Sequence, residues 1–435
     1  MVKLLVIILA TLLIYRKTVY YGYIIDDIQV ATHIRPRGFW RNLWWQIKGG
    51  AYTNSRVEHT ITLLLHTINS CLIFLAFGRT GIAFLASLLF ALNPANTQAS
   101  VWLSGKVYSA AVTMLLLGIW FKWLFPIFYL MGTFFSLNIV LAPLLFLFLQ
   151  PWFMALMVGF VFIKHKNRLV KEPTRRYNQS TPWMQELSLR KLIICIKTYG
   201  YYFKLGVFPT KLGMCHTYLH VFGLSKRETE QWYSLDKYFW LGIAVGIATI
   251  ASVFFHQWGL VWFTILIAQW CNLMVLNHPI CERYLYLPNI GLMLFLSSFL
   301  LSLPYGTYLA VAYLTYYAVR LSAFLPAYEN NLEYFKSNSE NFPDIAIPYN
   351  QYALELIRFG NPMSAVDNFM KGLYYRPNDF RCNFNLANLF INLGRFNDAI
   401  PFINLAEQNL DPNNNYEVWK NQVESMKYKI SQNIK

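Results

Sequence analysis

The chain has 435 residues, of which 56% are hydrophobic and only 13% are charged. Soluble domains average about 25% charged residues, and disordered chains need low hydrophobicity, so the composition excludes both classes. The 18% aromatic content suits a chain that lies mostly in lipid, because Trp and Tyr gather at membrane interfaces. The formal net charge of +16 then fits anionic lipid headgroups better than nucleic acid, and we expect no nucleic-acid partner.

Apolar runs predict an all-α fold, with about eleven membrane spans in a helical bundle. A membrane helix needs about 20 mostly apolar residues, and the run at 1–15 lacks the cleavage site of a secretory signal. The other predicted spans cover 59–78, 80–93, 102–121, 124–141, 143–163, 189–208, 239–256, 259–277, 287–303 and 305–322.

The basic loop at 164–176 indicates a cytoplasmic N-terminus, because loops rich in Lys and Arg stay on the cytoplasmic side. Eleven spans then place the C-terminal region outside the membrane on the extracytoplasmic side. The first outer loop covers about 20–58, and its segment 36–50 has the pattern of an interfacial amphipathic helix. A helix packed on its own protein is the alternative for that segment.

After about residue 323 the apolar runs stop and an internal repeat begins. Gly360 recurs as Gly394, Ala365 as Ala399 and Gly372 as Ala406, each at a spacing of 34. This period, with a proline closing each unit, is typical of tetratricopeptide repeats. We therefore expect a membrane domain at 1–322, a connector at 323–348 and an α-solenoid at 349–435. Because three repeats are usually needed for stability, the two present should rest on the connector or on the membrane domain.

An adjacent acid pair, Asp26 and Asp27, follows the first predicted span. Residues 1–330 contain only ten carboxylates, so candidates for acid–base chemistry are few. An acid pair beside apolar residues should contain one carboxyl group with a raised pKa, which suits a general base. A helix N-cap followed by a solvated acid is the alternative.

His59 and His66 lie two helical turns apart in the second predicted span. Polar groups inside a span usually face a cavity or another helix. A metal site would prefer a pair at i and i+4 with further ligands, so histidines bonded within the bundle are the simpler interpretation.

Two polar breaks interrupt the apolar runs. The break at 92–106 is expected to present its polar residues at the outer surface, namely Asn93, Asn96, Gln98, Ser104 and Lys106. The break at 277–291 carries Glu282 and Arg283, whose guanidinium fork suits a phosphate. By itself the first break reads as a loop, and for the second break a structural Glu–Arg pair is the alternative to a phosphate contact.

The order of these motifs is similar to that in the transmembrane and tetratricopeptide-repeat containing family. The resemblance rests on the acid pair, "HTITLLLHTINSCLIF" at 59–74, "LNPANTQASVWLSGK" at 92–106, "FFSLNIVLAP" at 134–143, "YYFKLGVFPTKLG" at 201–213, "ERYLYLPNIG" at 282–291 and the closing repeats. It covers nearly the full chain. The family and its bacterial relatives are class C glycosyltransferases with a multi-span membrane domain.

The resemblance implies a transferase that moves a sugar from a polyprenyl or dolichyl phosphate to a hydroxyl acceptor, typically a protein Ser or Thr, on the outer side. Asp26 and Asp27 then supply the catalytic base, and the reaction inverts the anomeric carbon. The donor and its phosphate are expected at Arg283, Lys106, His59, His66, Glu282, Asn93 and Gln98. The repeats, framed by Gly360 and Gly394, recruit the acceptor. No resident cofactor is expected, and no residue pattern supports a divalent metal.

This chain departs from the family pattern at four positions. The His of its His-Pro falls on Asn93, its Glu on Gln98, and its Lys-Glu on Leu137 and Asn138. A catalytically inactive relative that acts as a membrane scaffold through its repeats is therefore one alternative, and a transporter or flippase is another. We expect an integral membrane protein, in a bacterial plasma membrane or, in a eukaryote, in the endoplasmic reticulum.

Overall fold

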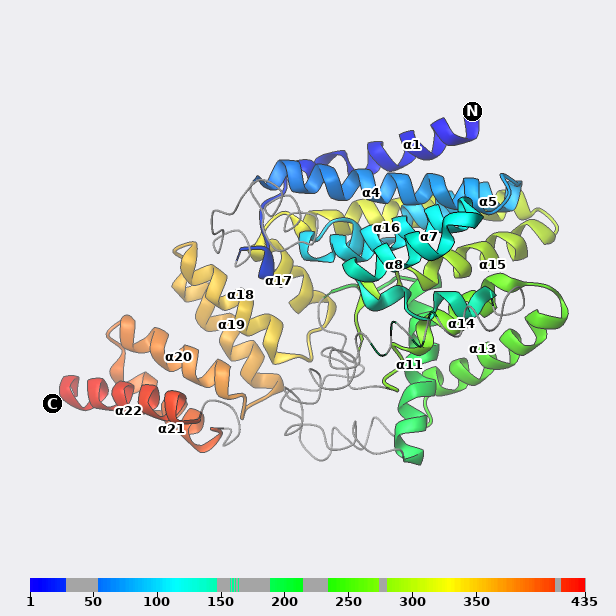
Figure 1. The fold of residues 1–435 in the computed structure, drawn as a ribbon. Helices are drawn as coiled ribbons and strands as arrows, with labels where there is room; N and C mark the ends of the chain where they lie inside the picture. Colours follow the sequence, from blue (N-terminus) through cyan, green and yellow to red (C-terminus); the bar gives the residue numbers. More distant parts are fainter. Residues whose placement is uncertain are drawn as a thin grey trace. The chain divides into compact units, whose positions relative to one another are not determined.

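The computed structural model describes most of the chain as helices. The described residues are 1–28, 54–146, 188–213, 234–273, 280–410 and 416–434, with Met157, Gly159, Val161 and Ile163. They form helices and no strands, which confirms the all-α prediction (Figure 1). The chain divides into two compact units, one made of 1–212 and 226–330, the other of 213–225 and 331–435.

Among the described residues of the first unit, four helical stretches are long and apolar enough to cross a membrane. They are α4 (Ser55–Ala76), Leu103–Trp120, α13 (Lys237–Phe254) and Gly306–Tyr328. The second stretch joins the 3₁₀ turn η3 (Leu103–Gly105) to α7 (Lys106–Trp120), and the fourth joins α16 (Gly306–Phe324) to η11 (Leu325–Tyr328). Three shorter apolar helices are α5 (Gly81–Leu92), α14 (Trp258–Ala268) and α15 (Pro288–Ser302). These helices support the prediction of a membrane protein.

The remaining helices of this unit are shorter or more polar. They are α1 (Val2–Tyr15), η1 (Arg16–Tyr20), η2 (Pro94–Asn96), α6 (Thr97–Ser100), η4 (Lys122–Leu124), α8 (Phe125–Phe135), η5 (Leu137–Ile139), η6 (Ala142–Phe146), α11 (Leu189–Val207) and η10 (Glu282–Leu285). The predicted helix at 36–50, the loop at 164–176 and most of the predicted span at 143–163 lie outside the described residues.

The helix predicted for 124–141 ends early, at Phe135. Ser136 takes an extended backbone conformation and accepts a hydrogen bond from the Asn138 amide through its hydroxyl. This serine caps the next short turn instead of continuing the helix, because its side chain competes with the helical hydrogen bonds. The prediction of one uninterrupted span over this range was wrong.

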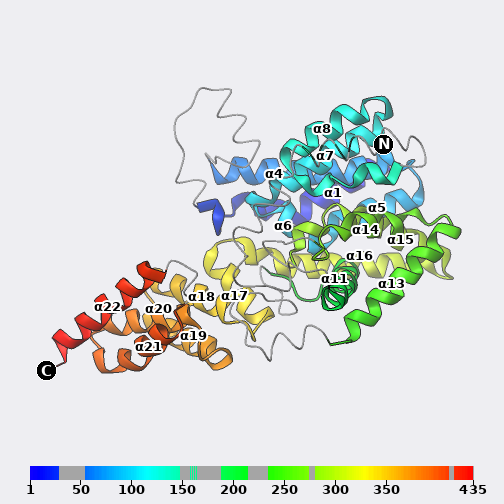
Figure 2. The same cartoon turned by 60° about the horizontal axis from the view of Figure 1, so that its bottom comes forward.

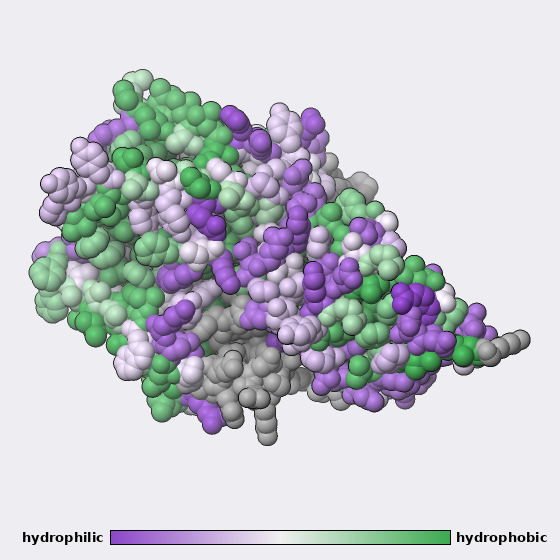
Figure 3. Space-filling model, turned by 180° about the vertical axis from the view of Figure 1, so that it is seen from behind, coloured by the Kyte–Doolittle hydropathy of each residue, from purple (hydrophilic) through white to green (hydrophobic). Residues whose placement is uncertain are grey.

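Large apolar side chains cover the outer face of α13. Trp240, Ile247, Ile250 and Phe254 are between 59% and 77% exposed. Figure 3 shows broad apolar areas on the surface of the first unit. Contiguous apolar surface of this kind marks an interaction site or a lipid contact, and on a helix of membrane length it fits lipid.

Glycines let the helices of this unit approach closely. A Cβ atom added to Gly200 of α11 would lie 2.2 Å from the Tyr238 carbonyl oxygen of α13, and one added to Gly242 would lie 2.2 Å from the Ile196 carbonyl oxygen. Small residues at such crossings are typical of helix packing in membranes.

The second unit consists of consecutive helices from α17 to α22. They are α17 (Asn331–Asn341), α18 (Ala346–Arg358), α19 (Pro362–Tyr375), α20 (Phe380–Asn392), α21 (Phe396–Gln408) and α22 (Tyr416–Asn433). Figures 1 and 2 both show α18 beside α19 and α20 beside α21. The helix α17 lies within the predicted connector and packs against α18, which supplies the support expected for two repeats.

The 34-residue spacing corresponds to two helix pairs that end their first helices in the same way. Gly360 and Gly394 have left-handed backbone angles, with φ of 77° and 70°. The amides of Asn361 and Arg395, one residue later, both donate to a carbonyl five residues back. Glycine adopts this conformation without a Cβ clash, so each glycine turns the chain into the second helix of its pair.

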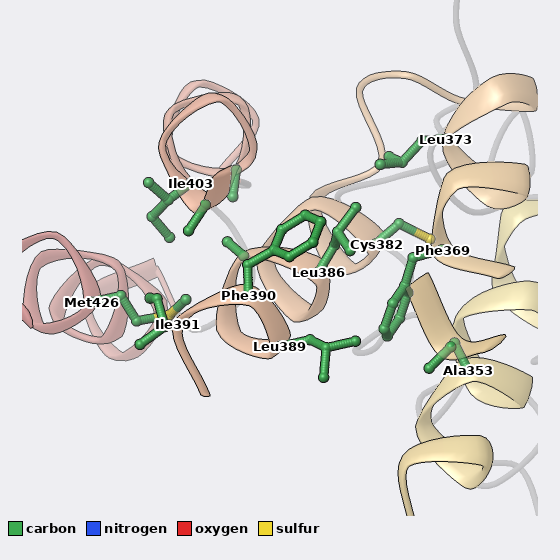
Figure 4. Packing of buried hydrophobic residues seen from close by; sticks show 14 of the residues in the cluster. Ala353, Phe369, Leu373, Cys382, Leu386, Leu389, Phe390, Ile391, Ile403 and Met426 are labelled. Carbon is green, nitrogen blue, oxygen red and sulfur yellow. The ribbon is translucent and has the colours of Figure 1, made fainter. Parts of the chain in front are cut away.

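An apolar core runs through this unit (Figure 4). Phe369 of α19, Leu386 and Phe390 of α20, Ile403 of α21 and Met426 of α22 are all buried within it. The small residues of the repeat also contribute, since Ala365 and Ala399 are fully buried. Burial at this spacing explains the repeated small residues, because a larger side chain there would separate the paired helices.

Candidate functional site

The first unit buries a cluster of charged groups around the segment Trp102–Lys106. Every second residue of this segment contacts a charged side chain from another part of the unit. Trp102 contacts Arg283, Ser104 contacts Asp27, and Lys106 contacts Glu58. We define these six side chains as the charged cluster.

Asp27 is fully buried and is held by one of its two carboxylate oxygens. Its Oδ1 accepts hydrogen bonds from the backbone amide of Ser104 at 2.9 Å and from the Ser104 hydroxyl at 2.7 Å. Its Oδ2 is buried and has no hydrogen-bond partner among the described residues. Burial raises the pKa of Asp27 to about 6, although the Ser104 hydrogen bonds act in the opposite direction.

The two acids of the pair lie in different surroundings. Asp26 is exposed, whereas Asp27 is 0% exposed. Ile25, immediately before them, has a φ of 50°, a left-handed conformation that is unfavourable for a β-branched residue. This local turn sends the two neighbouring carboxylates in different directions, and Asp27 has the raised pKa predicted for one member of the pair.

The segment before Asp27 is fixed from two sides. The amide of Gly22 donates to the carbonyl oxygen of Glu329 at 3.0 Å, and His59 Nε2 lies 3.2 Å from the Gly22 carbonyl oxygen. Tyr23, between them and the acid pair, has its pKa raised by burial and by the charges of Glu58 and Asp27. These contacts place Tyr23 near both carboxylates.

Lys106 and Glu58 form a buried ion pair. The side chain of Lys106 is 3% exposed and that of Glu58 is 1% exposed. Two charges can share such a site only if they neutralise each other, because removing an unpaired charge from water is very unfavourable. Each of the two side chains therefore depends on the other for its compensation.

Arg283 is held between aromatic rings. Its guanidinium carbon lies 5.2 Å from the centre of the Trp102 ring and 5.4 Å from that of Tyr284. Tyr284 in turn stacks on Trp270, with 4.0 Å between the ring centres. Tyr108 also hydrogen-bonds the guanidinium. This arrangement limits the rotamers of Arg283 while preserving its charge.

Gln98 connects the two polar breaks of the sequence. Its Oε1 accepts hydrogen bonds from the Cys281 thiol at 3.3 Å and from the Arg283 amide at 3.4 Å. Gly105 lies directly against the same residue, because a Cβ there would be 1.8 Å from the Gln98 carbonyl oxygen. The amide of Gln98 thus helps to fix Arg283 through the backbone.

His66 and Asn93 lie in the packed interior. His66 is fully buried, with Nδ1 2.8 Å from the Tyr286 hydroxyl and Nε2 3.1 Å from the Ala91 carbonyl oxygen. Asn93 donates to the Gly206 carbonyl oxygen at 2.9 Å. Both residues therefore bond within the helix bundle and connect its helices.

The expected exposure of the break at 92–106 was wrong. Asn93, Asn96, Gln98 and Lys106 are at most 2% exposed, and only Ser104 is partly exposed. The segment folds into short helical turns that direct its polar groups at partners inside the unit. Asn93 and Gln98 bond backbone groups, whereas Ser104 and Lys106 bond carboxylates. Buried polar side chains are normally satisfied in this way.

Glu282 also lies inside the unit, as do Leu137 and Asn138, the remaining two positions at which this chain departs from the family pattern. Glu282 is fully buried. Asn138 is 1% exposed, and its side-chain amide has no hydrogen-bond partner among the described residues, while Leu137 is partly buried.

Sequence reasoning missed Glu58, Ser104 and Trp102 as members of this cluster. Glu58 had a detectable signal, because it is one of few carboxylates and begins a helix of membrane length. Its partner Lys106 lies 48 residues away, so their contact depends on the tertiary fold. Ser104 and Trp102 carried no signal of their own.

The described residues contain no group of three or more His, Cys, Asp or Glu side chains that could hold a metal ion. The ionisable groups of the charged cluster are the carboxyl groups of Asp27 and Glu58, the Lys106 amine and the Arg283 guanidinium. No protein-family model matches the chain, and neither a curated protein nor a solved structure matches it.

Proposed function

We propose that the protein is a membrane glycosyltransferase of class C that uses a sugar carried on a polyprenyl or dolichyl phosphate. The observation that supports this most directly is the state of Asp27. Its carboxyl group is buried, oriented through one oxygen, and leaves the other oxygen without a hydrogen bond in the described part of the chain. A carboxylate with its pKa raised toward neutrality is a suitable general base.

The proposed reaction is a single displacement. Oδ2 of Asp27 takes the proton of an acceptor hydroxyl, and the hydroxyl oxygen attacks the anomeric carbon of the donor sugar. The bond between that carbon and the phosphate oxygen breaks, and the lipid phosphate leaves with the bonding electrons. The anomeric carbon is inverted. Phosphate is a good leaving group, so no general acid is required.

Arg283 is our candidate for stabilising the departing phosphate. A guanidinium offers two parallel hydrogen bonds to phosphate oxygens, and the Trp102 and Tyr284 rings hold it in place. Lys106 adds a second positive charge nearby, balanced by Glu58. The proposal thus retains Asp27, Arg283 and Lys106 in roles at the reaction centre, and Asp26, His59, His66, Asn93, Gln98 and Glu282 as residues of the surrounding fold.

We further propose that the first unit is a multi-span membrane bundle, with the second unit on the extracytoplasmic side as a tetratricopeptide-like solenoid. The membrane-length helices support the first part. The repeated glycine turns at Gly360 and Gly394 support the second. The acceptor is a protein or peptide hydroxyl that this solenoid brings to the membrane surface.

The test uses the full chain reconstituted in lipid nanodiscs. It is supplied with polyprenyl phosphates that carry radiolabelled mannose, glucose or N-acetylglucosamine, and with Ser- and Thr-containing peptides. We expect transfer from one donor, retained in Asp26→Asn and reduced by about 10²-fold or more in Asp27→Asn. Transfer at the wild-type rate in Asp27→Asn, or no transfer from any donor by the wild type, would contradict the proposal.

A membrane scaffold is the second candidate function, and the roles of Gln98 and Asn93 favour it. Both are neutral where the family pattern has ionisable residues, and both are used as hydrogen-bonding groups inside the bundle. A scaffold would keep its cellular role in Asp27→Asn, whereas the transferase would lose it.

A further inference from the structure

Ser104 makes the closest described contact to the proposed base. Its amide and its hydroxyl both donate to Oδ1 of Asp27, and neither donates to Oδ2. A carboxylate that is free to rotate presents its two oxygens equally, whereas these two donors distinguish them. The serine thus distinguishes Oδ1, which it bonds, from Oδ2, which has no hydrogen-bond partner among the described residues.

The backbone around Ser104 makes this arrangement rigid. Ser104 is the middle residue of η3, between Trp102, whose ring lies against Arg283, and Lys106, which is paired with Glu58. Gly105 packs against the Gln98 carbonyl oxygen, leaving no space for a Cβ. The serine hydroxyl therefore approaches Asp27 from a segment that is fixed on both sides.

We propose that Ser104 is a positioning residue for the transfer reaction, which holds Oδ1 of Asp27 so that Oδ2 faces the acceptor hydroxyl. This inference rests on the proposed function. Ser104 itself touches neither the sugar nor the phosphate, and it acts only through Asp27. The other ionisable groups around Asp27 are Tyr23 on its own segment, Glu58 and His59 on α4, Lys106 on α7, and Arg283 beside Trp102.

The effect of the Ser104 hydroxyl can be separated from that of side-chain shape by comparing threonine with valine at this position. Ser104→Thr keeps the donor, and Ser104→Val has the shape of threonine without it, while Ser104→Ala removes the donor without adding volume. Ser87→Ala is the control, because the Ser87 hydroxyl is buried and bonds the Ala83 carbonyl oxygen of its own helix, away from Asp27.

The primary measurement is the pH dependence of kcat/KM in nanodiscs. A hydrogen bond to the charged carboxylate favours ionisation, so its loss should move the acid limb of the profile to higher pH by about one unit. We expect this shift in Ser104→Val and Ser104→Ala, none in Ser104→Thr or Ser87→Ala, and an unchanged KM for the donor lipid. An acid limb that stays in place in both donor-free variants would overturn the inference.

A second measurement does not depend on activity. Infrared difference spectroscopy follows protonation of the Asp27 carboxyl, identified as the signal that is missing in Asp27→Asn. Its titration should show the same upward shift in Ser104→Ala. If Asp27→Asn remains active, the proposed function fails, while this titration still decides whether Ser104 controls Asp27. If Asp27→Asn is inactive but the Asp27 titration does not shift in Ser104→Ala, the proposed function stands and only the role of Ser104 is refuted.

Discussion

The two units of the chain use buried and exposed charge in opposite ways. In the first unit, Glu58 and Lys106 form an ion pair that is at most 3% exposed. In the second unit, Glu407 pairs with Lys427 at 45% and 35% exposure, around a core of apolar side chains. The same pair of residue types is therefore part of the interior in one unit and a solvated surface contact in the other. The comparison teaches that the chemistry of a charged pair depends on its surroundings more than on its members.

The strongest way to test this comparison is to neutralise one acid in each pair. Glu58→Gln leaves Lys106 buried without its counter-ion, and we expect the free energy of unfolding to fall by about 3–5 kcal/mol. Glu407→Gln should change it by about 0–1 kcal/mol, because water replaces the lost partner. The measurement is unfolding by SDS in mixed micelles, followed by tryptophan fluorescence. Equal losses in the two variants would remove the distinction between the units.

The apolar core of the second unit can be tested by removing one of its buried side chains. Phe369 is fully buried, and Phe369→Ala should destabilise this unit by about 3–5 kcal/mol, because a cavity remains. Tyr374 on the same helix is 81% exposed, so Tyr374→Ala should cost less than about 0.5 kcal/mol. The stability losses of both variants can be measured in the full chain, from the protection of backbone amides in α18 to α21 against hydrogen exchange. Unchanged protection in Phe369→Ala would show that this core does not hold the repeats together.

Asp27 gives the first unit a stability that depends on pH. Its folded-state pKa of about 6 lies above the ordinary value of about 3.9, so the fold favours the protonated form. Stability is therefore lost as pH rises from about 4 to about 6, by about 3 kcal/mol in total. Asp27→Asn should be more stable than the wild type by up to this amount at pH 7.5, and equally stable at pH 4.

The control for this prediction is the exposed neighbour. Asp26→Asn should show no comparable gain at either pH, because water already solvates that carboxylate. Thermal unfolding of the three proteins at both pH values is the measurement. If the stability difference between Asp27→Asn and the wild type is the same at both pH values, the gain does not come from the ionisation of Asp27.

A smaller effect is expected from the close packing at Gly105. Gly105→Ala would place a methyl group 1.8 Å from the Gln98 carbonyl oxygen, and the resulting shift should cost about 1–3 kcal/mol. Gly81→Ala is the control, since nothing lies within 4 Å of a Cβ at that helix start. Unfolding midpoints of the two variants in mixed micelles should differ accordingly, and a neutral Gly105→Ala would mean that the Trp102–Lys106 segment can relax freely.

Features of the fold that depend on local pattern were accessible from the sequence. Apolar runs predicted most of the helices of the first unit, and the spacing of Gly360 and Gly394 predicted two equivalent turns, because helix formation and left-handed glycine turns are set by neighbouring residues. The acid pair was found for a similar reason, as charges stand out in an apolar segment.

The internal arrangement of the site was not accessible. Asp27 meets Ser104 across 77 residues, and Gln98 meets Arg283 across 185. Nothing in the local sequence distinguishes a polar residue that faces water from one that bonds a distant carbonyl, so Asn93 and Gln98 were expected at the surface. Tertiary hydrogen bonds decided their burial.

The hydrogen bond between Gly22 and Glu329 has a consequence for biosynthesis. The ribosome makes Gly22 early, but its partner emerges only after the last membrane-length helix of the unit has been synthesised. Contacts of such long sequence separation form late, because the intervening chain must first be ordered. The segment that carries Asp27 therefore reaches its final position only in a completed membrane unit, and a chain that is truncated during translation carries the acid without its anchor.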